Sequence, residues 1–146
     1  MRSELIYAAR ARWRASLVEL GALMHEGIGD TVTATAKRDE AALHLLHADL
    51  LEAVGKAKDD FVAVRYSAVK SASQEDLVDI ALGNKSVDDL PNVAEAKAAL
   101  HAARDELRDT ERRWREIDQL TGNRARWSII NHFTEPSDDE LLEGSL

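Results

Sequence analysis

The sequence predicts an elongated all-α protein: a long antiparallel helical hairpin resembling a coiled coil, with a third helix at the N-terminus, a short inserted helix and a C-terminal peptide arm. Ala, Leu, Glu, Arg and Lys dominate the 146 residues, and this composition is typical of long helices. Only seven Gly and two Pro are present, too few to separate many strands. Two long stretches also carry apolar residues at alternating steps of three and four, the period of packed helices.

The first helix is predicted over residues 3 to about 25. Ser3 has the side chain of an N-cap. Gly27, Gly29 and Asp30 end the helix. Its apolar positions recur at helical spacing and are Ile6, Ala9, Trp13, Leu17, Leu20 and Met24.

The second helix is predicted to begin near residue 33, with Thr31, Thr33 and Thr35 as alternative caps, and to run from about 35 to 71. Its heptad positions are Glu40, Leu43, His47, Leu50, Val54, Ala57, Phe61, Val64 and Ala68. A helix of this length spans about 55 Å. A compact domain of this size has a radius of gyration near 15 Å, so the helix must lie in an elongated structure.

A short helix is predicted over residues 74 to 82, where Ser73 caps the first turn and Gly83 follows the last. A turn-rich loop then leads to the last long helix, from Val93 to Thr121. Its heptad positions are Val93, Ala96, Leu100, Ala103, Leu107, Thr110, Trp114 and Ile117. The two long helices should fold back as an antiparallel hairpin, with the first helix packing alongside to complete a three-helix core.

We predict two parts of the chain, a helical bundle domain over residues 1–122 and a C-terminal docking segment and acidic arm over 123–146. The docking segment contains an apolar patch that is too short to form its own core and must pack on another surface. Its residues, predicted to bind a partner, are Trp127, Ile129, Ile130 and Phe133.

The last thirteen residues, 134–146, carry five carboxylates and no cation. Ser137 with Glu140 can cap one helical turn that presents Leu141 and Leu142 to a partner. A solubilising terminus that binds nothing is the alternative.

Glu40, His44 and His47 lie on one stripe of the second helix, and carboxylate and imidazole suit Zn, Fe or Mn. A complete site needs a further ligand from another helix. The alternative is that these polar residues set the register of the hairpin, and we predict no cofactor.

Arg38, Asp39 and His44 fit an arginine-polar-spacer-histidine pattern. This stretch of seven residues resembles the signature of HEPN-type ribonucleases. The resemblance implies an all-α dimer in which Arg38 clamps a phosphate and His44 acts as the general acid or base. Arg126 and His132 have the same spacing, so the pattern occurs twice in the chain.

Charge and composition favour a protein partner or a homo-oligomer over nucleic acid. The net charge of −8 disfavours nucleic acid as a general partner. Residues 1–20 and 121–133 each have a charge of +2, so the chain carries segments of opposite sign that can contact a charged protein surface or another copy. The chain has no Cys, no signal-peptide pattern and no apolar run of membrane length. We therefore expect a cytoplasmic protein, or a virion protein if it comes from a phage, with no membrane partner.

The predicted function is that of a non-enzymatic structural or adaptor subunit that assembles through helical packing and its C-terminal arm. A phage-particle component would fit this shape. A ribonuclease using Arg38 and His44 is one alternative. A small nucleic-acid-binding regulator is the other, since all three Trp residues directly follow an Arg.

Overall fold

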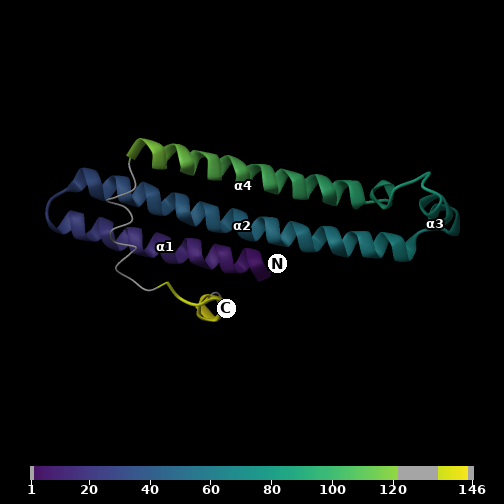
Figure 1. Cartoon of the computed structure of the whole chain (residues 1–146), viewed down its shortest axis with the longest axis horizontal. Coiled ribbons are helices and arrows are strands. Elements are labelled where there is room, and N and C mark those ends of the chain that lie inside the picture. The colour runs from purple at the N-terminus through teal and green to yellow at the C-terminus, as the bar shows by residue number, and fades with distance from the viewer. Residues whose placement is uncertain (1, 122–134, 145–146) are drawn as a thin grey trace.

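A computed structural model describes residues 2–121 and 135–144. Within these ranges the chain forms helices and no strands. The elements are α1 (Arg2–Gly27), α2 (Thr31–Ser71), α3 (Gln74–Ala81), the 3₁₀ turn η1 (Val87–Asp89), α4 (Val93–Thr121) and α6 (Asp138–Gly144). The three long helices lie side by side with α2 in the middle (Figure 1). The predicted all-α helical hairpin is confirmed.

Two predicted helix starts are wrong. Ser3 lies inside α1, where its hydroxyl donates a hydrogen bond to Glu4 at 3.0 Å instead of capping the helix. The N-cap of α2 is Asp30, whose carboxylate accepts a hydrogen bond from the Thr33 N–H at 3.1 Å. The helix therefore begins at Thr31 and none of the threonines caps it. Gly29, at φ 82°, makes the tight turn between α1 and α2.

The predicted heptad stripe of α2 lies against α4. Every one of its side chains, from Glu40 to Ala68, is buried or half-buried. The matching stripe of α4 is also buried or half-buried from Val93 to Trp114, while the side chain of Ile117 lies outside the described residues. The 3,4 spacing of large apolar residues therefore identified this interface correctly.

The buried face of α1 agrees only in part with the predicted one. Ala9 and Leu17 of the predicted stripe are buried, at 6% and 7% exposure. Alanines spaced seven apart form the buried face of both helices, each no more than 4% exposed. They are Ala8, Ala15 and Ala22 in α1, and Ala34, Ala41 and Ala48 in α2. Leu20 and Met24, which were predicted on the packing face of α1, are 40% and 60% exposed. Small side chains let two helices approach closely, which explains why they occupy the contact.

An ion pair closes this interface at the N-terminus of α1. Lys58 Nζ donates to Glu4 at 2.7 Å, and the Glu4 side chain is only 11% exposed. This hydrogen bond, despite partial burial, lowers the pKa of Glu4 to about 2. Glu4 and Lys58 therefore mark the point along α2 beside which α1 begins.

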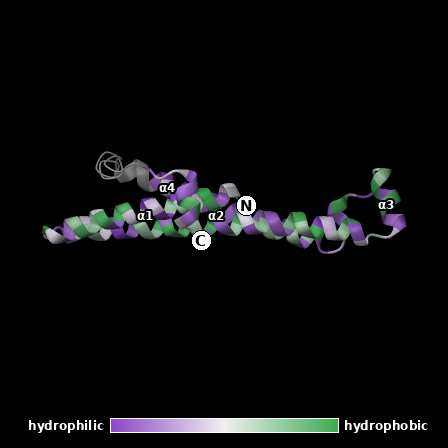
Figure 2. Cartoon of the chain, turned by 90° about the horizontal axis from the view of Figure 1, so that it is seen from below, coloured by the Kyte–Doolittle hydropathy of each residue, from purple (hydrophilic) through white to green (hydrophobic). Residues whose placement is uncertain are grey.

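The three long helices form an open layer and not the closed three-helix core that was predicted. α1 and α4 each pack mainly on α2, and they leave a groove between them. Seen from below, the molecule is long and thin, and polar and apolar residues alternate along the helices (Figure 2). Beyond the N-terminus of α1, α2 continues toward α3, and among the described residues α4 and the loop that follows α3 lie beside this part of α2 (Figure 1).

Candidate functional site

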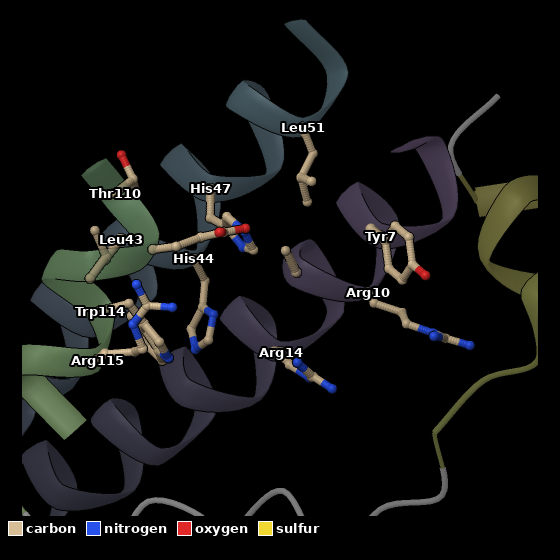
Figure 3. A pocket seen from close by; sticks show the side chains of 12 residues that line it. Tyr7, Arg10, Arg14, Leu43, His44, His47, Leu51, Thr110, Trp114 and Arg115 are labelled. Atoms are coloured by element: carbon tan, nitrogen blue, oxygen red, sulfur yellow. The ribbon is translucent and has the colours of Figure 1, made fainter. Parts of the chain in front are cut away.

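A groove lies where α1, α2 and α4 meet (Figure 3). Its volume is about 600 Å³. Aromatic, apolar, cationic and imidazole side chains line it together: Tyr7, Arg10, Ala11, Arg14, Leu43, His44, His47, Leu51, Thr110, Glu111, Trp114 and Arg115. Sequence positions more than a hundred residues apart contribute to one surface.

Two histidines of α2 connect the floor of the groove to α4. The His44 ring lies 4.1 Å from the Trp114 ring, at an interplanar angle of 52°. His47 Nε2 is 3.3 Å from Glu111 Oε1. Both contacts join residues at the same register of the antiparallel pair, so they fix how α2 and α4 are aligned.

Cationic side chains stand at the rim. Arg10 and Arg14 extend from α1, away from Trp114 and Arg115 of α4 (Figure 3). A guanidinium group has five donors in a fixed geometry and suits carboxylate or phosphate groups. The groove can therefore bind an anionic group beside an apolar surface.

Carboxylates of the C-terminal arm form ion pairs with these two arginines. Arg10 Nη2 is 2.6 Å from Asp138 Oδ1, and Arg10 Nε is 3.5 Å from Glu135 Oε1. Arg14 Nη2 lies 3.8 Å from the same Glu135 oxygen. Glu135 is thus placed between two guanidinium groups of α1.

The arm forms the helical turn that the sequence predicts. The Ser137 N–H donates to Glu140 Oε2 at 3.1 Å, and the Glu140 N–H donates to Ser137 Oγ at 3.4 Å. Leu141 is 7% exposed and lies in a depression shared with Ala9 and Trp13 of α1. The arm therefore packs on its own chain. Leu142 is half-buried.

The other predicted partner-binding residues, Trp127, Ile129, Ile130 and Phe133, lie outside the described residues. Whether they or the arm bind a partner stays a prediction.

Beside the arm, Arg12 pairs across to α2. Its guanidinium donates to Glu52, and to Asp49 at 3.2 Å. The hydrogen bond from Arg12 lowers the pKa of Glu52. Arg12 therefore forms its ion pairs across the interface of α1 with α2, whereas Arg10 and Arg14 form theirs with the arm.

The residues considered for metal binding do not converge. Glu40 Oε1 is 4.0 Å from His44 Nε2, whereas His47 turns to Glu111. Within residues 2–121 and 135–144, no three His, Asp or Glu side chains are placed to hold a metal ion. Whether Glu40, His44 and His47 set the register of the hairpin stays a prediction.

Arg38 and His44 are not brought together within one chain. Arg38 forms ion pairs with Glu26 and, at 3.6 Å, with Glu19 of α1. His44 is buried against Trp114 in the groove, and Arg38 does not line that groove. The ribonuclease alternative would need a second subunit to supply the missing half of the pair.

Comparison with known proteins gives no relative: no family model, no curated protein and no solved structure matches the chain. Among the described helices, none is long and apolar enough to cross a membrane. Inference about function therefore depends on the surfaces of this molecule.

The sequence did not single out the groove. Tyr7 and Arg14 belong to it without a motif, and Thr110 was predicted only as a heptad position. Their proximity depends on how α1 and α4 flank α2. One signal was available: Arg10 and Arg115 both lie in Arg-Trp clusters, which hinted at a shared surface.

Proposed function

We propose that this protein is a non-enzymatic assembly subunit, which packs against further copies of itself through its helical faces. The observation that carries the proposal is the α1-facing stripe of α2, which continues past the end of α1. A cytoplasmic protein or a phage-particle component would suit such a role.

The exposed continuation has the same seven-residue spacing as the buried alanines. Val62 and Val69 follow Gly55 at steps of seven, and Tyr66 lies between them. Their exposed fractions are 66%, 39% and 69%. A stripe that is covered by α1 over one half of α2 is thus open over the other half. A contiguous exposed apolar face is typical of an interaction site.

α3 carries further exposed apolar side chains at the same end of the molecule (Figure 1). Leu77, Val78 and Leu82 are 41%, 51% and 69% exposed. At the opposite end, beside the turn between α1 and α2, Ile28 and Val32 are 78% and 81% exposed. Apolar side chains at both ends of a long subunit give each copy more than one contact, which supports assembly over a single closed pair.

The second copy is the favoured occupant because the stripe is continuous with an interface that this chain already makes with its own α1. A second copy carries the same exposed stripe at the same concentration, so two stripes can pack against each other in a self-complementary contact.

The test is a double substitution on the stripe, Val62→Asp with Val69→Asp, measured by native mass spectrometry and light scattering. We expect the wild-type chain to form a dimer or larger oligomer. The variant should dissociate at least about tenfold more readily, because buried carboxylates are costly.

Ala42→Asp with Ala53→Asp is the matched control. It adds the same charge to exposed positions of the same helix, away from the stripe, and should assemble like the wild type. A wild-type chain that stays monomeric at the highest concentration measured, or an unaffected stripe variant, would overturn the proposal.

A further inference from the structure

We infer that the α1 surface holding the arm is an acceptor site for the arm of a second copy, so that subunits exchange arms when they assemble. The acceptor consists of Ala9, Arg10, Trp13 and Arg14. The arm consists of residues 135–144. The inference rests on the proposed function, since it names a second contact between copies of an assembling chain.

The acceptor has both polar and apolar parts that match the arm. Arg10 and Arg14 receive the carboxylates of Glu135 and Asp138 at 2.6 to 3.8 Å. Leu141 enters the depression beside Ala9 and Trp13. Guanidinium pairs select an anion, and the apolar depression selects a side chain about one helical turn further on. The site therefore fits an acidic amphipathic helical turn, which is the structure of the arm.

The contact within one chain is too small to be permanent. α6 has seven residues, and isolated helices of that length are marginal in water. Its ion pairs are partly exposed, with the Glu135 and Asp138 side chains at 43% and 50%, and such pairs each stabilise weakly. Leu141 is the buried apolar residue of α6 among those described. The arm can therefore leave the acceptor readily.

A neighbouring copy offers the leaving arm an identical site. Thirteen residues, 122–134, separate α4 from the arm, and a chain of that length can span up to about 45 Å. Copies that are already held together present their arms to one another at a high local concentration, so exchange replaces each contact with an equal one.

Arm and acceptor are different surfaces, and this decides the form of the assembly. When each of two subunits gives its arm to the other, the exchange closes a dimer. When each subunit gives its arm to the next, the contact is heterologous and forms a ring or a filament. Arm exchange can therefore lock contacts that the α2 stripe initiates.

Two full-length variants with complementary charge changes test the inference. The first carries Arg10→Glu and Arg14→Glu, which spoils its acceptor. The second carries Glu135→Arg and Asp138→Arg, which spoils its arm. In each variant alone the arm and the acceptor have like charges and repel each other, whereas in a mixture each arm finds an acceptor of opposite charge on the other variant.

Both pairs are placed in the Val62→Asp, Val69→Asp background, so that assembly through the stripe does not contribute. Native mass spectrometry should then show a mixed complex of the two variants, favoured at least about tenfold over either self-complex. The mixed complex should weaken as salt is raised, because partly exposed ion pairs are screened. Circular dichroism checks that both variants keep the helicity of the parent.

A substitution in the apolar contact gives a second measurement. Leu141→Asp in both variants should abolish the mixed complex, whereas Glu143→Lys in both variants, at an exposed position, should leave it in place. Folded variants that form no mixed complex would overturn arm exchange. That result would leave the proposed function standing if the wild-type chain still assembles, so the two failures are distinguishable.

Discussion

The two long interfaces of α2 solve the same packing problem with different residues. Toward α4, the heptad positions carry mostly large side chains, and many of these are only half-buried. Polar pairs such as His47 with Glu111 lie at the groove. Toward α1, alanines every seven residues are almost completely buried. The difference shows that burial depends on how closely two helix axes approach, and not only on how large the apolar residues are.

The largest expected effect comes from shortening a side chain in the α4 interface. Leu100 is 5% exposed on the stripe that faces α2. Leu100→Ala should lower the free energy of unfolding by about 2–4 kcal/mol, because it removes buried methyl groups and leaves a cavity. Urea unfolding measures this value.

Leu45→Ala removes the same atoms from a side chain that is 47% exposed, and serves as the control. The free energy of unfolding should fall by less than about 1 kcal/mol, since truncating a half-exposed side chain removes less buried apolar surface. Equal costs at the two positions would show that Leu100 does not pack against α2 as described.

The interface between α1 and α2 should instead be destabilised by a larger side chain. Ala48 is 0% exposed in the cluster with Ala8, Ala11 and Leu51. Ala48→Leu should cost about 1–3 kcal/mol, because the added atoms force α1 and α2 apart. Ala42→Leu, at an exposed position of the same helix, should be nearly neutral because Leu is also a good helix former. A neutral Ala48→Leu variant would mean that the helices are not closely packed.

A smaller, pH-dependent effect is expected where the α1 interface ends. The pKa of Glu4 is lowered to about 2 by the hydrogen bond from Lys58, so the ionised carboxylate stabilises the folded state above the ordinary pKa of 4.5. Glu4→Gln should cost about 1–2 kcal/mol at pH 7, the range allowing for the partly exposed Lys58.

The difference between wild type and the Glu4→Gln variant should shrink as pH falls from about 4.5 toward 2, because the wild-type carboxylate becomes protonated. Glu19→Gln removes a carboxylate whose side chain is 48% exposed, and should change stability less at every pH. Urea unfolding curves measured over this pH range give the stability of each variant. A difference between wild type and Glu4→Gln that does not change with pH would contradict the assigned role of the Glu4 pair.

Much of the fold was predictable because the α2 and α4 stripes combine large apolar residues with a regular 3,4 period. The Ser73 and Ser137 caps were predictable because they depend on neighbours three residues away. The α1 interface was predicted only in part, since Ala is a strong helix former in any position and 23 alanines give little contrast between buried and exposed faces. Its seven-residue repeat is nevertheless present in the sequence.

The sequence by itself determined the helices, their approximate ends, the face joining α2 to α4 and the acidic character of the arm. These features follow from local spacing and short-range hydrogen bonds. Only the tertiary structure decided that Arg10 and Arg14 receive the arm, that His44 lies against Trp114, and that the α2 stripe is left open beyond Glu4. Such contacts join residues far apart in the chain, and they depend on the alignment of whole helices, which no local pattern specifies.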